Sequence, residues 1–309
     1  MYELNELSTQ NLLDGWSLLY AKLAKNIMDT LGRAGEGVIR EAVRRYGHDC
    51  GLQRQKLHLE YNVKTNLSNL FFFGTECNGN CNNDCNSYFH YDPRFRHQLQ
   101  HLGEQAYLND VITCPIADFW DLRGEKQLGR FFCEEFYHAM VSAYCYDISQ
   151  TNISKTLTHE GDNHCRFAIY MRAANLSKNL RQQSYTQFDP GYQPPSPETL
   201  PALSVKERYK EMCLKMYYYF LETAAERFQE EGRCAVAIGL RKLAVAAADY
   251  MRLRADMTGN QPDEAYVNEN FPIDFAVEQD AFWDCYNKFG AQKLFCNNFL
   301  YNYNASLGY

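Results

Sequence analysis

The chain has 309 residues, of which 46% are hydrophobic and 22% charged, and its formal net charge is −7 at pH 7. This composition supports a sizeable hydrophobic core and is not that of a disordered chain. The acidic balance disfavours nucleic acid and anionic membrane surfaces as partners, because both attract a basic face. Aromatic residues make up 15% of the chain, which fits dense core packing or, alternatively, a pocket for a planar ligand.

The first residues, MYELNELSTQNLLDGW, lack a basic stretch followed by an apolar run, so no signal peptide is predicted. No segment approaches the roughly 20 apolar residues of a membrane span. Without a secretion signal, the twelve cysteines are interpreted as reduced thiols, metal ligands or a nucleophile. We therefore expect a cytoplasmic protein with a small-molecule substrate and no nucleic-acid or membrane partner, and homo-oligomers stay open as an alternative.

Hydrophobic periodicity predicts mostly helices in the first half of the chain. Apolar residues at helical spacing predict helices over residues 12–28 and 38–46, and a longer pattern of the same kind covers residues 125–146. Residues 56–73 contain a β-prone run that ends in three phenylalanines. Residues 153–171 predict a β-hairpin around a Gly-Asp-Asn turn.

The second half of the chain is predicted to be helical. A Pro-rich linker is expected over residues 181–203. Ser204 and Glu207 have the spacing of a capping box, and two helices are predicted to follow, up to residue 257. A final helix is predicted over residues 280–303. The predicted fold class is α+β, predominantly helical, with a small antiparallel sheet or hairpin in the first half.

Two stretches of the chain match each other without gaps. DFWD at 118–121 and FCEEF at 132–136 correspond to AFWD at 281–284 and FCNNF at 295–299. Tryptophan precedes cysteine by 13 residues in both stretches. Because both residue types are rare, equal spacing by chance is improbable. A second match aligns the Gly-Arg pair at residues 32–33 with the pair at residues 232–233.

These matches predict an internally duplicated helical module. Residues 1–180 would form the first copy, with a Cys-rich insertion at 74–93, and residues 204–309 would form a degenerate second copy after the linker. Cys296 keeps the position of Cys133, but the neighbouring carboxylates and the histidine of the first copy are replaced. Only the first copy therefore carries residues suited to chemistry.

Cys133, Glu134 and His138 form the first candidate catalytic group. Glu134 and His138 are four residues apart on a predicted helix and share a face, and Cys133 lies about 100° away. A thiol needs a base or a cation nearby to become a thiolate, and His138 or His164 would supply it. The alternative is a cysteine that only packs in the core, which the retention of Cys296 favours.

The predicted hairpin carries the second candidate group. Its alternation places Cys165 and Phe167 on one face of the strand, and His164 and Arg166 on the other. Asp162, in the turn, and His164 are candidates to orient substrate or water. Arg166 is a candidate to bind a substrate carboxylate through its planar fork. The alternative is a solvated hairpin with a buried cysteine.

The Cys-rich insertion predicts a candidate metal site. Cys77, Cys81 and Cys85 are spaced by three residues each, and His90 follows. Thiolates and an imidazole within one short loop are ligands that Zn²⁺ accepts, whereas the alternative is an Asn-rich loop of free thiols. No cofactor is required by the other candidate residues. The chain lacks a Gly-rich phosphate loop, a GxSxG elbow and an HExxH motif, which disfavours nucleotide-dependent enzymes, serine hydrolases and zincins.

With these motifs, the first 170 residues resemble the L-2-amino-thiazoline-4-carboxylic acid hydrolase family. The resemblance rests on several short stretches: YAKLAK at 20–25, GEGVIREAVRRYG at 35–47, CP at 114–115, WD at 120–121, FCEE at 132–135 and GDNHCRF at 161–167. The family name implies hydrolytic opening of a cyclic, amidine-like thiazoline. The Cys-rich insertion and the second copy depart from a single-module member.

The resemblance leads to a hydrolase that acts on a C–N bond of a small cyclic amidine or amide. Cys133 would be the nucleophile or a pocket thiol, with Cys165 beside it, and Trp120 joins Arg166 as a candidate substrate-binding residue. One alternative is a non-catalytic protein that binds a small ligand or a metal. Another is a biosynthetic relative that forms an amide or closes a ring, because the same groups serve both directions.

Overall fold

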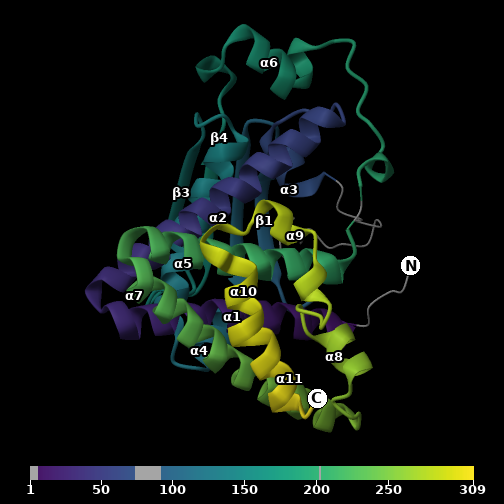
Figure 1. The fold of residues 1–309 in the computed structure, drawn as a ribbon. Coiled ribbons are helices and arrows are strands. Elements are labelled where there is room, and N and C mark those ends of the chain that lie inside the picture. Colours follow the sequence, from purple (N-terminus) through teal and green to yellow (C-terminus); the bar gives the residue numbers. More distant parts are fainter. Residues whose placement is uncertain (1–5, 74–91, 202) are drawn as a thin grey trace. The chain divides into compact units, whose positions relative to one another are not determined.

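The computed structural model describes residues 6–73, 92–201 and 203–309 (Figure 1). Its described part is mostly helical and contains one four-stranded antiparallel sheet, which confirms the predicted α+β class with helices predominating. The chain divides into two compact units. Unit 1 comprises Met1–Val43, Phe119–Phe131 and Leu203–Tyr309, and unit 2 comprises Arg44–Asp118 and Phe132–Ala202.

Three of the unit boundaries fall within helices, so both units contain parts of the same helices. The helices are α1 Glu6–Leu31, α2 Arg33–Glu60, α3 Leu67–Phe72, α4 Pro115–Asp121, α5 Lys126–Tyr144, α6 Lys178–Ser184, α7 Val205–Thr258, α8 Glu264–Asn270, α9 Phe282–Cys285, α10 Ala291–Phe295 and α11 Tyr301–Leu307. The strands are β1 Arg96–Leu102, β2 Ala106–Thr113, β3 Gln150–Lys155 and β4 Cys165–Tyr170. None of the described helices combines the length and the apolar character that a bilayer crossing needs.

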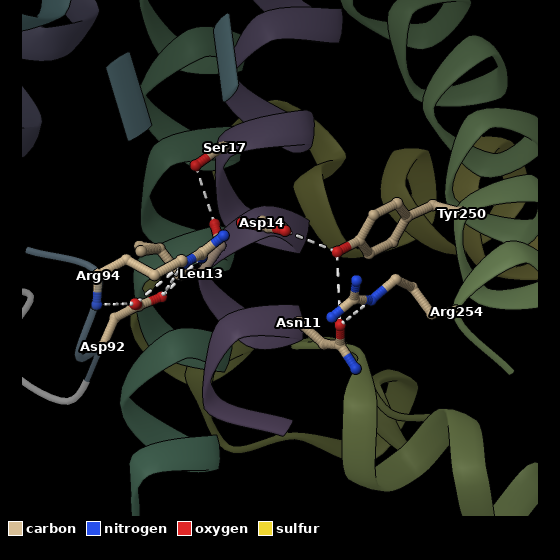
Figure 2. A network of polar contacts seen from close by, with 8 residues as sticks. All are labelled: Asn11, Leu13, Asp14, Ser17, Asp92, Arg94, Tyr250 and Arg254. Atoms are coloured by element: carbon tan, nitrogen blue, oxygen red, sulfur yellow. Dashed lines mark hydrogen bonds and ion pairs between the residues drawn. The ribbon is translucent and has the colours of Figure 1, made fainter. Parts of the chain in front are cut away.

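In unit 1, α1 packs along α7, and α10 and α11 lie against α7 as well (Figure 1). The apolar face of α1 is fully buried, as its helical spacing requires. Polar contacts also join the two helices (Figure 2). Tyr250 of α7 donates to Asp14 of α1 at 2.7 Å, and the Arg254 guanidinium donates to the amide oxygen of Asn11 at 2.5 Å. Asn11 is fully buried, so this bond satisfies a polar group that water cannot reach.

Each of the two long helical stretches turns a sharp corner. Gly32, between α1 and α2, has φ +57°, and Gln229, inside α7, has φ 47°. After each corner a glycine lies against the preceding helix. A Cβ on Gly35 would lie 2.8 Å from the carbonyl oxygen of Ile27, and one on Gly232 would overlap the carbonyl group of Ala224. The corners therefore depend on residues without a side chain at the point of contact.

Two buried tyrosines make parallel contacts in unit 1. Tyr20 of α1 donates to the carbonyl oxygen of Leu128 at 2.7 Å, and Tyr217 of α7 donates to that of Ala291 at 2.8 Å. Each tyrosine also contacts a buried tryptophan. The ring centroids of Tyr20 and Trp120 are 4.9 Å apart, and those of Tyr217 and Trp283 are 6.4 Å apart.

In unit 2, the strands lie in the order β1-β2-β4-β3. In β4 every second residue is buried, which places Cys165, Phe167 and Ile169 on one face. Arg166 alternates with them and lies directly opposite Asp110 of β2. The predicted hairpin over 153–171 corresponds to β3 and β4, and the predicted separation of its two faces is confirmed.

Two secondary-structure expectations were wrong, and two strands were missed. Residues 56–73 are not a strand, because α2 continues to Glu60 and α3 begins after Asn66, whose side chain caps its N-terminus. Strands β1 and β2 precede the hairpin in the sheet and were not predicted. The final helix over 280–303 is broken by Phe289, with φ 57°, and by a π-helical turn over Cys296–Leu300.

Other expectations were met or lie outside the described part. Helices over 12–28 and 38–46 are confirmed as parts of α1 and α2, and the helix predicted over 125–146 corresponds to the slightly shorter α5. The Ser204–Glu207 capping box is present at the start of α7, and the kink at Gln229 divides α7 into the two predicted helices. Most of the Cys-rich insertion, residues 74–91, lies outside the described residues.

Candidate active site

Helix α5 and strand β4 bring Cys133 and Cys165 together in unit 2. Tyr137 of α5 lies on the same helix face as Cys133, one turn away, and Phe167 of β4 lies on the same strand face as Cys165. The rings of Tyr137 and Phe167 meet edge to face, with centroids 4.9 Å apart. This contact places the thiol face of the helix against the thiol face of the strand. The two sulfur atoms are close enough to interact electrostatically, because Cys133 raises the pKa of Cys165.

A third cysteine joins this pair. Cys114 follows β2 and precedes α4, and β2 is the direct neighbour of β4 in the sheet. Val111 of β2 is the register partner of Cys165. Cys114 raises the pKa of Cys133, and Cys165 raises that of Cys114. We refer to Cys114, Cys133 and Cys165 as the thiol cluster. Sequence reasoning missed Cys114 as a site residue, although its position before a helix-starting proline marks the end of a strand.

The loop between β3 and β4 supplies hydrogen bonds to the thiol cluster. The backbone N–H of Leu157 donates to Sγ of Cys165 at 3.2 Å, and the side chain of Thr158 hydrogen-bonds Cys133. Asp162 holds this loop, because its carboxylate accepts from the backbone N–H of Thr156 at 3.1 Å. The predicted role of Asp162 in orienting substrate stays a prediction, and its observed role is to position the loop. The contributions of Leu157 and Thr158 carried no sequence signal.

All three thiols are held in the neutral form. Burial raises the pKa of Cys114, of Cys133 and of Cys165 to about 12 in each case. For Cys133 the cause second to burial is Cys114, the Thr158 hydrogen bond favours the thiolate, and the Glu134 carboxylate opposes it. An approaching cation would favour the thiolate, whereas an approaching carboxylate would oppose it. The site therefore suits a cationic or neutral electrophile better than an anion.

The carboxylate that acts on the pKa of His138 is not that of its predicted partner, Glu134. His138 lies near the surface of α5, where partial loss of solvent around the ring lowers its pKa, and the carboxylate that opposes this shift is that of Glu135. Glu135 also forms an ion pair with Arg44 of α2 at 3.2 Å. Glu134 acts instead on the neighbouring Cys133. Of the first candidate group, the structure thus connects Glu134 with the thiol and His138 with Glu135.

His164 and Arg166 lie on the opposite face of the sheet from Cys165. Both Nε and an Nη of Arg166 donate to Asp110, at 3.0 and 2.9 Å, and Nε2 of His164 lies 4.0 Å from the same carboxylate. Gln100 donates to Asp110 at 2.9 Å. The hydrogen bonds from Arg166 lower the pKa of Asp110 below its usual range. The fork predicted to bind a substrate carboxylate is thus occupied by a carboxylate of the chain itself.

Trp120 is a core residue of unit 1. Its ring is 1% exposed, its Nε1 donates to the carbonyl oxygen of Ser17 at 3.0 Å, and a Cβ on Gly129 would overlap the ring. These contacts fill the surface that a bound substrate would need. The packing interpretation of this tryptophan is therefore favoured over the predicted substrate contact.

The predicted metal ligands Cys77, Cys81, Cys85 and His90 all lie outside the described residues, so this site stays a prediction. Within residues 6–73, 92–201 and 203–309, no group of three or more His, Cys, Asp or Glu side chains has an arrangement that could hold a metal ion. The thiol cluster thus does not have the geometry of a metal centre. Its chemistry, as described, is that of protonated thiols.

Comparison with known proteins agrees with the resemblance seen in the sequence. No curated protein and no solved structure matches the chain. A family model does match, over residues 13–169, which is just over half of the chain. The match runs from α1 into β4 and includes all three members of the thiol cluster. The chain belongs to the family described as L-2-amino-thiazoline-4-carboxylic acid hydrolase.

Proposed function

We propose that the protein hydrolyses a C–N bond of a small cyclic amidine, with 2-amino-thiazoline-4-carboxylate as the model substrate, and that Cys133 is the nucleophile. The family name supports hydrolysis of such a ring. The thiol cluster carries the proposal within the structure, because three elements distant in sequence converge there on Cys133, which is only partly buried. Substrate identity beyond this chemical class is part of the proposal.

The neutral state of Cys133 fits addition to an amidine. The S–H bond would add across the C=N bond: sulfur bonds to carbon, the π pair moves to nitrogen, and nitrogen takes the thiol proton. One C–N bond of the tetrahedral adduct then breaks: the departing nitrogen keeps the bonding pair and takes a proton from the remaining nitrogen, whose lone pair forms a new C=N bond. Water adds across this C=N bond, and Cys133 then leaves with a proton as the remaining nitrogen-bearing carbon becomes a carbonyl. The sum is one water consumed, one C–N bond broken and one carbonyl formed.

The surrounding charges support a cationic substrate head. A protonated amidine would approach Glu134, whose carboxylate acts on Cys133, and would lower the pKa of the thiol on arrival. Its nitrogen already carries the proton, so in this case the thiol proton would pass to the Glu134 carboxylate instead. Thr158 would stabilise the developing thiolate through its hydrogen bond. Asp162 is a positioning residue in this scheme, since it holds the loop that carries Thr158. Proton transfer by Glu134 or His138 is part of the proposal.

The test is turnover of 2-amino-thiazoline-4-carboxylate by the full chain, followed by mass spectrometry for a product that has gained one water. Wild type should form this product, and Cys133→Ala should slow its formation at least ~10³-fold. Cys296→Ala is the matched control, because it also removes a buried cysteine from the chain but should leave turnover unchanged. Full activity of the Cys133→Ala variant would rule out the nucleophile, and an inactive wild type would rule out this substrate.

We also propose that residues 204–309 are a second, degenerate copy of the helical module. Three contacts of the first half have a counterpart in the second half. In each case the residue numbers of the two partners differ from those of their counterparts by the same two constant offsets. Tyr20 with Leu128 corresponds to Tyr217 with Ala291, Trp120 corresponds to Trp283, and Arg44 with Glu135 corresponds to Arg241 with Asn298. In this register Gly35 corresponds to Gly232 and Gly32 to Gln229, so the Gly-Arg match in the sequence is displaced by three residues.

A further inference from the structure

A groove lined by basic side chains runs between α1 and α7, within unit 1. It encloses about 590 Å³. Four cations line it, Lys22 and Lys25 from α1 and Arg241 and Lys242 from α7, together with two carboxylates. An excess of cations in one concave site stands out on a chain whose net charge is −7.

The two lysines of α1 are paired with carboxylates. Lys22 lies 3.4 Å from Glu125, and Lys25 lies 3.3 Å from Asp29, which is one of the two carboxylates in the groove. The other, Asp249, lies 3.2 Å from Arg252, which is outside the groove. The acids present therefore already have basic partners, and they do not balance the two cations of α7.

Arg241 and Lys242 are held by neutral amides. Nε of Arg241 donates to the side-chain oxygen of Asn298 at 2.8 Å, and Nζ of Lys242 donates to that of Asn26 at 2.5 Å. Within the part of the chain that the structure describes, neither cation forms an ion pair with a carboxylate. An amide oxygen fixes the position of a cation without cancelling its charge.

These two amides are themselves fixed. Asn26 and Asn298 are 2% and 6% exposed. The side-chain N–H group of Asn26 donates to the carbonyl oxygen of Ala235 at 2.6 Å, and that of Asn298 donates to Leu294 at 2.9 Å. Each amide oxygen therefore has to point at its cation. Asn298 also lies in the π-helical turn, a local distortion that recurs at functional sites.

The corresponding pair in the first half of the chain is neutral. Arg44 lies 3.2 Å from the carboxylate of Glu135, whereas its counterpart Arg241 meets the amide of Asn298. The same backbone arrangement thus accommodates a carboxylate at this position. The amide leaves the positive charge of Arg241 available to a ligand.

We propose that the groove between α1 and α7 binds a compact, multiply charged anion that carries phosphate groups. Arg241 would contact two phosphate oxygens with its planar fork, and Lys242 would add a point charge beside it. Lys25, with its exposed partner Asp29, would complete the site from α1. This site is independent of the proposed hydrolysis, because none of its residues belongs to the thiol cluster.

The experiment is calorimetric titration of the full chain with pyrophosphate at low and at high ionic strength. Wild type should bind one pyrophosphate per chain, and Arg241→Gln and Lys242→Gln should each weaken binding at least ~10-fold. Asn298→Asp should do the same, because it restores a carboxylate partner to Arg241 without changing the side-chain shape. Lys293→Gln, an exposed lysine of α10 outside the groove, should bind like wild type.

Parallel titrations with inorganic phosphate and with citrate separate phosphate recognition from general attraction of anions. Tighter binding of pyrophosphate than of citrate supports the proposal, and equal binding overturns the phosphate assignment. Urea unfolding midpoints within error of wild type show that the variants are folded. Unchanged affinity in both Arg241→Gln and Lys242→Gln would overturn the site, as would an equal loss in Lys293→Gln.

Discussion

In the proposed register of the two copies, Cys133 and Cys296 correspond to each other, yet their surroundings differ. Cys133 faces the sheet and has Cys114 and Thr158 beside it. Cys296 is 2% exposed and begins a π-helical turn, and burial raises its pKa to about 11. All four described strands lie in unit 2, so no described strand joins Cys296 in unit 1. Of these two cysteines, only Cys133 is a candidate nucleophile, because the sheet of unit 2 brings further polar groups to it.

The scaffold contacts of the two regions show the opposite behaviour. The tyrosine-to-carbonyl hydrogen bonds of Tyr20 and Tyr217 differ by only 0.1 Å, from 2.7 to 2.8 Å. The arginine contacts keep their position but exchange a carboxylate for an amide. In the proposed register the packing contacts therefore match while the charged partners differ, which is expected if the first region supplies the chemistry and the second completes the core.

The largest effect is expected at the corner of α7. A Cβ on Gly232 would overlap the backbone of Ala224, and backbone atoms have little room to move, so Gly232→Ala should lower the free energy of unfolding by about 3 kcal/mol or more. Gly35→Ala, where the nearest atom is 2.8 Å away, should cost about 1–2 kcal/mol. Urea unfolding measures both.

Gly191→Ala is the control for these two variants, because nothing lies within 4 Å of its added Cβ and the backbone there needs no positive φ. Its free energy of unfolding should stay within about 0.5 kcal/mol of wild type. If Gly232→Ala were equally harmless, the corner of α7 would not depend on a residue without a side chain at position 232.

A pH dependence of stability near neutral pH is expected from His58 of the first region. His58 of α2 is fully buried, with Nδ1 2.7 Å from the Tyr144 hydroxyl, and burial together with the nearby Arg54 lowers its pKa to about 2. The unfolded chain takes up a proton at His58 below pH about 6.5, and the folded chain does not. The stabilising difference is therefore complete above pH 6.5 and is lost as the pH falls, by about 1.4 kcal/mol per unit. In the proposed register of the two copies, the residue of α7 that corresponds to His58 is Ala255.

His58→Asn should remove this part of the pH dependence. Between pH 7.5 and pH 5.0, wild type should lose about 2 kcal/mol more of its free energy of unfolding than the variant does. Urea titrations at both pH values measure the difference. His159→Asn, which replaces an exposed histidine, should keep the wild-type loss. Equal losses in wild type and His58→Asn would show that His58 can be protonated in the folded chain.

Periodicity was sufficient to predict α1, α5 and the faces of β4, because each has one apolar side against the core. It failed for β1, whose sequence RHQLQHL is mostly polar on both faces, as expected for an exposed edge strand. The phenylalanines at 71–73 suggested a strand, but the cap at Asn66 and tertiary packing favour the helix α3. Two helices were predicted within α7, but the residue at the corner, Gln229, was not, because a positive φ is expected at glycine.

The candidate site was predicted only in part, for a related reason. Cys133 and Cys165 were identified because rare, reactive residue types are visible in any sequence. Cys114 and Thr158 join them only through the order of the strands and the path of the loop after β3, which no local pattern encodes. The partner of Arg166 was likewise set by strand register, since Asp110 lies 56 residues earlier in the chain.

The smallest expected effects test whether the two tyrosines have equal roles. Tyr20→Phe and Tyr217→Phe each remove one hydroxyl from a fully buried ring and leave the acceptor carbonyl without that donor. Each should lower the free energy of unfolding by about 1–2 kcal/mol, and the two values should agree within about 0.5 kcal/mol. Tyr301→Phe loses an exposed bond to Glu278 and should change stability by less than about 0.5 kcal/mol. A loss of stability confined to Tyr20→Phe would mean that the hydrogen bond of Tyr217 does not stabilise the fold. The proposed correspondence between the two helical regions would then be supported by the positions of the two tyrosines but not by their contributions to stability.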